Sequence, residues 1–399
     1  MEKKCLIISY HFFPSNGVGA KRYNLFSKYF SNKFNTVNIL TIKEKYLPEK
    51  DETLVYGGEI YRTRYFPRYQ DNEKIITKII NRIILRVFPI DRYSAWIIPA
   101  LVKGIKIVRK NKINTIIVTG PPFSPFLTAY LLSFIFKIDL IIDYQDPWVL
   151  ADDYDVSWFK RRYTWFFEKL LLKNAKYVIF NTQTALNKYF KQKLKFAIEN
   201  KSFVIPNPYL CEERAEPLYL EKNKKVIIYA GNFYGNRRLK YIFEPLKHLF
   251  NNGELNNKVS IHVFGKIHEE DKDLIKELNL SKIITEHKWT NYSLLASYMK
   301  GADILYLSQG DDHRDCVPYK LTDYLTIRKP ILAVTSFNSA TYDLMQEVDC
   351  GIAVDMDDTN SIYNALKELL IDERNFSFAG TEKYSLKNTA EYYYKIIIS

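Results

Sequence analysis

Two glycines and a histidine follow the first apolar run of this 399-residue chain, residues 5–9. Gly17 and Gly19 flank a valine, and glycines in such a place let the backbone come close to a bound ligand. A single Gly-x-Gly occurs in many chains, but this one stands between a predicted strand and a predicted helix. It is therefore a candidate binding loop. His11 could line the same site or serve only the core.

A second candidate binding site lies where another short apolar run, residues 140–143, ends. Asp143 and Asp146 stand there, where a carboxylate can accept hydrogen bonds from a substrate. Asp146 precedes a proline, so it is equally typical of a simple turn. Both readings remain open at this point.

The other acidic residues do not form a convincing metal signature. Asp152-Asp153 and Asp311-Asp312 are adjacent pairs, and adjacent acids in a strand point to opposite faces and are usually solvated. Asp355-x-Asp357 lies near the last predicted strand. The four cysteines lack paired spacing, which argues against a zinc site or a disulfide framework and fits a reducing cytosol. We expect neither a metal ion nor another cofactor.

A repeated pattern of short strands and helices must position these residues. Continuous apolar runs of this length are typical of buried parallel strands covered by helices on both faces, and their alternation with helices predicts an α/β sheet. In the first half we expect strands at 5–9, 37–41, 115–119, 140–143, 177–180 and 203–205. In the second half we expect them at 225–230, 259–264, 283–284, 304–307, 331–334 and 351–354.

The length of the chain predicts two domains, since single cores stop growing at roughly 250–300 residues. Pro206-Asn207-Pro208 and the polar stretch after it indicate a linker. We expect two Rossmann-like, doubly wound domains that face each other across a cleft, with ligands at the carboxyl ends of the strands. The expected boundaries are 1–208 for the first domain, 209–224 for the linker, 225–380 for the second domain and 381–399 for a C-terminal helix that packs back toward the first domain.

Several motifs together resemble a known enzyme family. They are Gly231 at a strand end, Val263-Phe264-Gly265, and the segment VPYKLTDYLTIRKP at 317–330. Gly17-Val-Gly19 and the segment DYQDPW at 143–148 match the family's first domain, so the resemblance covers nearly the whole chain. In their order and spacing, these motifs resemble retaining GT-B glycosyltransferases of the bacterial surface-polysaccharide type (glycosyltransferase family 4-like). The resemblance implies that 1–208 binds the acceptor and 225–380 the nucleotide sugar.

The resemblance implies roles for two carboxylates separated by seven residues, Asp315 and Asp323. In the family, where both are usually glutamates, the second accepts hydrogen bonds from the ribose and the first lies near the hydroxyls of the donor sugar. A carboxylate only accepts hydrogen bonds and suits a vicinal diol. Aspartate reaches about one bond less far than glutamate, so Asp311 or Asp312 could take the place of Asp315.

The resemblance also implies cations for the leaving nucleoside diphosphate, whose charge grows as the glycosidic bond breaks. Arg237 falls six residues after Gly231, where the family has a donor-site lysine or arginine. We expect Arg237 to be catalytic, together with Asp315 and Asp146. Asn232 replaces an arginine that the family often has, so the second cation is missing or relocated. The candidates to replace it are Arg238, Lys266 and Lys320.

The helix that begins near residue 319 should direct its N-terminus at the diphosphate. The expected donor-binding residues are Gly17, Gly19, Gly231, Asn232, Arg238, Gly265, Lys266, Val317, Pro318, Lys320, Leu321 and Asp323. The expected acceptor-side residues are His11, Asp143 and Gln145, the last at a position where the family usually has arginine.

Positive charge is concentrated in the first half of the chain. Residues 1–205 contain 34 Lys+Arg and 17 Asp+Glu, whereas residues 206–399 contain 24 and 28. An anionic partner would explain the excess, and a lysine-rich genome is the plainer explanation. The segments Lys74–Lys112 and Trp158–Lys176 combine cations with apolar residues at helical spacing, as do helices that lie on anionic membranes. An internal helix with a solvated basic face gives the same pattern.

These observations predict a cytoplasmic enzyme, peripheral on the inner face of the plasma membrane, because no run reaches the roughly 18 apolar residues of a membrane span. We expect a retaining, metal-independent hexosyltransferase. It would move a sugar from a nucleotide diphosphate sugar, most commonly a UDP-sugar in the family, to a glycan or polyprenyl-linked acceptor of lipopolysaccharide or capsule biosynthesis.

Two alternatives remain open. A nucleotide-sugar epimerase on the same fold needs no acceptor, so the basic apolar segments disfavour it. A basic nucleic-acid-binding protein is suggested by the pI of about 9.2 alone. The chain lacks an arginine-rich or aromatic readout motif, so we expect no nucleic-acid partner.

Overall fold

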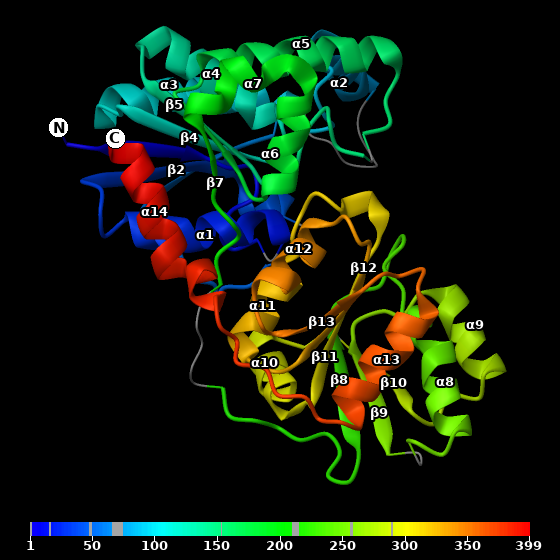
Figure 1. Ribbon diagram of the computed structural model, residues 1–399. Coiled ribbons are helices and arrows are strands. Elements are labelled where there is room, and N and C mark those ends of the chain that lie inside the picture. Colours follow the sequence, from blue (N-terminus) through cyan, green and yellow to red (C-terminus); the bar gives the residue numbers. More distant parts are fainter. Residues whose placement is uncertain are drawn as a thin grey trace. The chain divides into compact units, whose positions relative to one another are not determined.

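The computed structural model describes residues 2–15, 17–47, 50–65, 75–152, 154–209, 215–255, 258–288 and 290–399. The chain divides into two compact units, residues 1–208 with 386–399, and residues 209–385. Each unit contains a parallel sheet with helices packed against it (Figure 1). The fold class expected from the sequence, two Rossmann-like α/β domains, is therefore confirmed.

The sheet of the first unit has seven parallel strands in the order β3-β2-β1-β4-β5-β6-β7. They are β1 (Lys4–Ile8), β2 (Thr36–Ile42), β3 (Glu59–Thr63), β4 (Thr115–Gly120), β5 (Asp139–Tyr144), β6 (Tyr177–Phe180) and β7 (Ser202–Val204). The order reverses between β1 and β4, where doubly wound sheets bind ligands. Strand β3 was not predicted, because it lies at the sheet edge and mixes polar with apolar residues instead of forming an apolar run.

Helices cover both faces of this sheet. They are α1 (Val18–Phe30), α2 (Ile75–Val87), α3 (Ile97–Asn111), α4 (Ser124–Phe136), α5 (Trp158–Asn174), α6 (Gln183–Tyr189), α7 (Lys195–Ile198) and α14 (Leu386–Ile398). Helices α1 and α14 share one core, in which the rings of Phe26 and Phe30 meet Tyr393 edge-on. Side chains from α3, α4 and α5 belong to the core on the other face. The last helix of the chain therefore belongs to the first unit (Figure 1).

The sheet of the second unit has six parallel strands in the order β10-β9-β8-β11-β12-β13. They are β8 (Lys225–Ala230), β9 (Val259–Phe264), β10 (Ile284–His287), β11 (Ile304–Gln309), β12 (Ile331–Thr335) and β13 (Gly351–Val354). The helices are α8 (Phe243–Asn251), α9 (Glu269–Glu277), α10 (Tyr292–Gly301), α11 (Tyr319–Ile327), α12 (Ala340–Glu347) and α13 (Thr359–Leu370). Here the order reverses between β8 and β11, which places a second candidate site at the carboxyl ends of β8 and its neighbours.

Candidate functional site

Two glycines bring the ends of β8 and β9 into close contact. Gly231 (φ +122°) follows β8 and Gly265 (φ +151°) follows β9, in backbone conformations that side chains rarely adopt. A Cβ atom on Gly265 would lie 2.2 Å from the carbonyl oxygen of Gly231. The amide of Gly231 also donates a hydrogen bond to the carbonyl of Phe264, at 2.8 Å. The glycines found in the sequence thus leave bare backbone at this edge of the sheet.

Asn232 joins the loops that follow the two strands. Its side-chain oxygen accepts a hydrogen bond from the amide of Lys266 at 2.9 Å, and the amide of Phe233 donates to the carbonyl of Lys266 at 2.9 Å. The ammonium-bearing side chain of Lys266 remains exposed. Asn232 therefore fixes the geometry of the loops, while the charge that an arginine would bring must come from another residue.

Lys320 brings a cation to Gly231 from the first turn of α11. Its Nζ donates to the hydroxyl of Tyr229 at 2.6 Å and lies 4.0 Å from the centre of the Tyr229 ring. A Cβ atom on Gly231 would lie 2.6 Å from the Cε of Lys320, so a side chain at position 231 would displace the end of this lysine. Burial, with the nearby charge of Arg237, lowers the pKa of Lys320 to about 7. An anion beside Lys320 would favour its charged form.

A cavity of about 140 Å³ opens beside this lysine. Residues that line it include Gly231, Phe264, Thr290, Tyr292, Lys320 and Asp323. Asp323 accepts a hydrogen bond from the hydroxyl of Tyr292 at 3.3 Å. The cavity therefore offers an apolar wall, one cation and one carboxylate within a small volume.

Arg237 lies on the exposed ring of Tyr234, with its guanidinium 4.5 Å from the ring centre and bonded to the Tyr234 hydroxyl. Its Nε is buried and has no hydrogen-bond partner among the described residues. Asp315 is also buried. The loop before it is held by Gln309, whose amide donates to the carbonyls of His313 (2.6 Å) and Cys316 (2.7 Å).

Arg238 is engaged elsewhere, which corrects the expectation that it binds phosphate. Its guanidinium donates to the Oδ1 of Asp271 through Nε (2.9 Å) and Nη2 (2.6 Å), and its Nη1 lies 2.8 Å from Glu270. Asp271 is fully buried and needs a counter-charge, so this arginine is committed to an internal ion pair.

The other residues expected around the start of α11 have different surroundings. Pro318 is the N-cap of the helix, and Val317 packs against the core beneath it. Leu321 is fully buried in that core. Leu321 therefore holds the helix in place and does not face a ligand.

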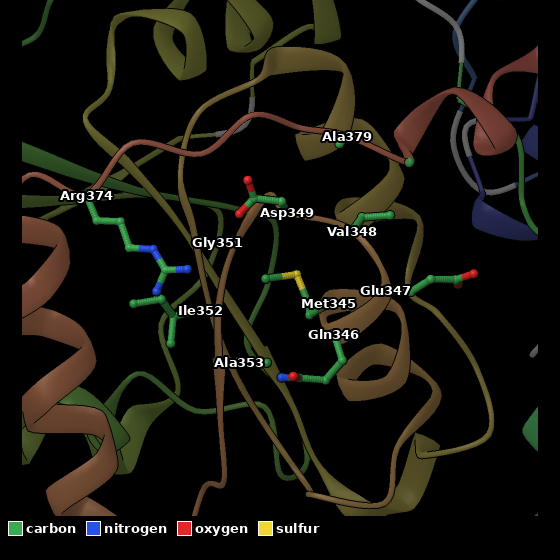
Figure 2. A pocket seen from close by; sticks show the side chains of 11 residues that line it. Met345, Gln346, Glu347, Val348, Asp349, Gly351, Ile352, Ala353, Arg374 and Ala379 are labelled. Atoms are coloured by element: carbon green, nitrogen blue, oxygen red, sulfur yellow. The ribbon is translucent and has the colours of Figure 1, made fainter.

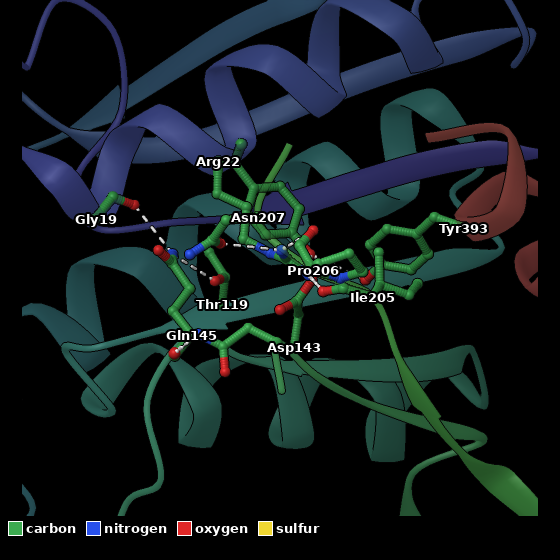
Figure 3. Close-up of polar contacts among 11 residues, drawn as sticks. Gly19, Arg22, Thr119, Asp143, Gln145, Ile205, Pro206, Asn207 and Tyr393 are labelled. Carbon is green, nitrogen blue, oxygen red and sulfur yellow. Dashed lines mark hydrogen bonds and ion pairs between the residues drawn. The ribbon is translucent and has the colours of Figure 1, made fainter. Parts of the chain in front are cut away.

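In the first unit, Asp143 lies in a closed network instead of an open site, contrary to its predicted acceptor role. Arg22 donates to its Oδ2 through Nε (3.2 Å) and Nη2 (3.1 Å), and Tyr23 donates to the same oxygen at 2.7 Å. Arg22 also donates to the carbonyls of Ile205 and Pro206 (Figure 3). Both charged side chains are fully buried. The sequence signal for Arg22 is an arginine on the apolar face of a helix.

Gln145 is also an internal link. Its side-chain nitrogen donates to the carbonyl of Gly19 at 3.1 Å and to the hydroxyl of Thr119 at 2.9 Å (Figure 3). It is nearly fully buried, so it positions the start of α1 and does not contact solvent. Asp146 is half-buried, two residues beyond the end of β5.

The glycine loop and His11 lie after β1. Gly17 is the N-cap of α1, and Cβ atoms on Gly17 and Gly19 would meet their nearest neighbours at 3.4 and 3.5 Å. The packing of the unit therefore does not require glycine at either position, which leaves ligand approach as a reason for both. His11 packs edge-on against Tyr10 and Tyr93, and burial, with the charge of Arg92, lowers its pKa to about 4. It is neutral near pH 7.

A larger cavity of about 460 Å³ lies beside the amino end of β13 and is lined by the side chains in Figure 2. Its charged groups are already engaged: Arg374 with Glu368 at 2.7 Å, Asp349 with the amide and hydroxyl of Ser377, and Glu347 with Lys383. None of the residues expected from the sequence lines it. We assign the functional site to the carboxyl ends of β8 and β9.

The two doubly wound units define the architecture of the GT-B glycosyltransferases. Residues 212–388 match the family model described as "Glycosyl transferases group 1", which spans the second unit and its strand-end site. This match and the fold together support a glycosyltransferase. No curated protein sequence shows a significant match to the chain.

Solved structures with similar folds cover nearly the whole chain at low identity. HepE of Anabaena, solved in complex with UDP and glucose, has a TM-score of 0.67 at 11% identity, with 100% of each chain covered. The lipopolysaccharide outer core galactosyltransferase WaaB has a TM-score of 0.67 at 12% identity, with 99% of each covered. UDP-GlcNAc 2-epimerase of Methanocaldococcus jannaschii has a TM-score of 0.56 at 15% identity, with 99% of each covered. Likeness at these identities shows the fold alone.

Among the described residues, no group of three or more metal-ligating side chains is close enough to hold an ion. No helix in the described part of the chain is long and apolar enough to cross a membrane.

Proposed function

We propose that the protein transfers a sugar from a UDP-sugar to a glycan or a lipid-linked oligosaccharide, with retention of configuration at the sugar. The observation that carries this proposal is the meeting of Lys320, Gly231 and Asp323 at one cavity. It lies at the switch point of the sheet that the glycosyl transferases group 1 match covers.

In this proposal the diphosphate lies over the bare backbone of Gly231 and Gly265, beside Lys320 and Arg237. Two fixed cations stabilise the charge that develops on the leaving group, in the way that a metal ion does elsewhere, so the reaction proceeds without one. Lys320 takes over the role of the arginine that Asn232 replaces. The lysine becomes fully charged when the diphosphate binds, because an adjacent anion raises its pKa.

The two aspartates have separate tasks. Asp323 accepts hydrogen bonds from the ribose hydroxyls, since it lines the cavity and a carboxylate suits a vicinal diol. Asp315 orients the donor sugar. The acceptor is bound by the first unit, near His11 and Asp146, at the carboxyl ends of β1 and β5.

Two of the fold relatives support the choice of substrates. HepE was solved with UDP, and WaaB is named as a galactosyltransferase of the lipopolysaccharide outer core. We infer a UDP-sugar as donor and a cell-surface glycan precursor, carried on a polyprenyl diphosphate or in a lipopolysaccharide core, as acceptor.

A donor panel followed by a turnover assay tests this function. Ligands that bind the folded state raise the melting temperature, so UDP and its cognate UDP-sugar should do so in metal-free buffer, while other nucleotides should not. UDP should then be released only when a lipid-linked glycan acceptor is added. If no nucleotide or nucleotide sugar shifts the melting temperature, the proposed function is wrong.

The epimerase alternative is kept because an epimerase shares the fold. It predicts conversion of the UDP-sugar to an epimeric UDP-sugar without acceptor. Nuclear magnetic resonance of the donor after incubation with the protein alone separates the two: an unchanged donor supports the transferase, and a new epimer supports the alternative.

A further inference from the structure

Helices α2, α3, α4 and α5 of the first unit leave large apolar side chains in solvent. The most exposed are Trp158 (73% exposed), Phe159 (71%), Phe134 (71%) and Phe166 (63%). The others are Ile79, Ile83, Val87, Ile98, Val102 and Ile135. These four helices hold half of the large apolar side chains that the described chain exposes. Scattered exposed apolar residues are ordinary, but such a concentration marks a surface that meets an apolar partner.

The four helices belong to one layer of the first unit. Side chains from all of them pack against the same core, and the hydroxyl of Tyr163 on α5 donates to the carbonyl of Val87 on α2 at 3.0 Å. Figure 1 shows these helices grouped on one side of this unit. Trp165 and Phe167 of α5 pack partly against this core. Lys74 and the side chains of residues 75–78, 80 and 81 lie outside the described residues.

Cations accompany the apolar side chains, and exposed acids do not. Exposed cations on the layer include Arg82, Arg86, Lys106, Arg109, Lys110, Arg161, Arg162, Lys169 and Lys173. Among the described side chains of the four helices the one carboxylate is Glu168, which is fully buried and accepts a hydrogen bond from Tyr189 at 2.6 Å. The nearest acids along the chain, Asp139 after α4 and Asp155 before α5, lie outside these helices. This layer therefore has no exposed negative charge of its own.

We propose that this layer, α2 to α5, docks the protein onto a lipid bilayer that contains anionic headgroups. Aromatic side chains on α4 and α5 enter the boundary between headgroups and acyl chains, and the cations beside them pair with lipid phosphates. A second copy of the chain would bring the same positive charge to the contact, so the charge favours an anionic partner. The large apolar rings favour a bilayer over a nucleic acid. The proposal rests on the first unit alone and does not depend on the proposed reaction.

Vesicle co-sedimentation of the full chain tests this docking. We expect binding to vesicles of phosphatidylglycerol and phosphatidylcholine, and much weaker binding to phosphatidylcholine alone. The double variant F159S/F166S should lower the partition coefficient at least tenfold, because two exposed rings no longer enter the bilayer. The matched control Y219S/Y392S removes two exposed aromatic rings outside the layer and should bind as the wild type does.

Charge is tested separately with R86Q/R162Q. Each cation near an anionic surface contributes about fivefold to binding, so this pair should lower it by roughly 25-fold at low salt and less at high salt. Both positions are exposed, and a melting curve for each variant verifies folding.

Several outcomes would overturn the proposal. They are equal binding to neutral and anionic vesicles, no binding to either, wild-type binding by both test variants, or a stable dimer in solution that F159S/F166S dissociates. Tight, salt-sensitive binding of RNA would equally reject it in favour of a nucleic-acid surface. UDP binding by each variant should remain unchanged, so a failed UDP assay with intact vesicle binding would reject the proposed reaction and leave the docking surface standing.

Discussion

The two sheets of this protein reverse their strand order in the same way but use charged side chains differently at their carboxyl ends. In the first unit, Asp143 is enclosed with Arg22, and the pair is fully buried and bonded to the backbone. In the second unit, Lys320 is half-buried against Tyr229 and lines a cavity. It forms no ion pair among the described residues. One sheet has an internally neutralised charge, and the other holds a cation whose anion must come from outside.

This difference has opposite consequences for stability. A buried ion pair is costly to break by removing one partner, because the other charge is then left buried without a counter-charge. The lowered pKa of Lys320 means that the folded state binds fewer protons than the unfolded state between about pH 7 and the ordinary lysine pKa of 10.5. Stability from this group therefore rises with pH across that window, and at neutral pH the lysine costs stability. The ion pair of the first unit therefore holds the fold together, whereas Lys320 of the second unit is placed to bind an anion.

The largest expected effect is on the first unit. Substitution of Asp143 by Ala should lower the free energy of unfolding by about 3–5 kcal/mol, because Arg22 stays buried without its counter-charge. Urea denaturation followed by tryptophan fluorescence measures this, since Trp96 and Trp148 are buried in that unit. The control, Asp323→Ala, should unfold within about 0.5–1 kcal/mol of the wild type. Equal stability of Asp143→Ala and Asp323→Ala would mean that Asp143 contributes no more to folding than Asp323 does.

The next effect is on donor binding. Lys320→Met should weaken UDP binding by roughly 10- to 100-fold, the cost of losing a hydrogen bond to a charged group. The melting temperature at pH 7 should stay the same or rise, because a desolvated cation has been removed. Isothermal titration in the presence of a chelator measures the affinity. Lys266→Met is the matched control, and a larger loss there than in Lys320→Met would move the second cation to Lys266.

A smaller effect is expected from Asp323→Asn. The side chain keeps its shape but becomes a weaker acceptor for the ribose hydroxyls, so UDP affinity should fall by about 5- to 10-fold. Wild-type protein should bind 2′-deoxy-UDP more weakly than UDP, and the variant should lose most of this preference. If the variant keeps the full preference for the ribose, Asp323 does not contact the sugar.

Much of the fold could be predicted because short continuous apolar runs are typical of buried parallel strands. The strands at 225–230 and 259–264 were predicted with the bounds that the structure has, and the glycines after them were predicted as site residues. The edge strand β3 was missed, because only its final residue, Thr63, is fully buried.

The partners of charged residues could not be predicted in the same way. Asp143 and Arg238 carry the side chains expected of a binding site, but their partners, Arg22 and Asp271, come from other elements of the chain. Only the packing of those elements decides that the charges neutralise each other internally. Lys320 and Gly231 are also far apart in sequence. Only the folded protein shows that the end of the lysine lies where a Cβ atom on Gly231 would be. Local patterns thus predict which residues can do chemistry, while packing decides which of them remain available.

The smallest effect is the pH dependence of donor binding, and it tests the second site most directly. With its pKa lowered to about 7, Lys320 is about half charged in the free protein at pH 7 and about one-tenth charged at pH 8. The diphosphate binds the charged form, so apparent affinity should fall about fivefold between these two pH values. The terminal phosphate of UDP is almost fully ionised in this range and adds little to the slope, since its pKa is near 6.

The groups that face this lysine are Tyr229, Arg237, Asp323 and Tyr324. The two tyrosines keep their protonation state between pH 7 and 8, because burial raises the pKa of Tyr229 and of Tyr324 further above the ordinary tyrosine value. Lys320→Arg should flatten the profile, because a guanidinium stays charged throughout. A wild-type profile that is already flat would mean that the lysine is charged before the donor arrives, and the two sheets would then differ less than their geometry indicates.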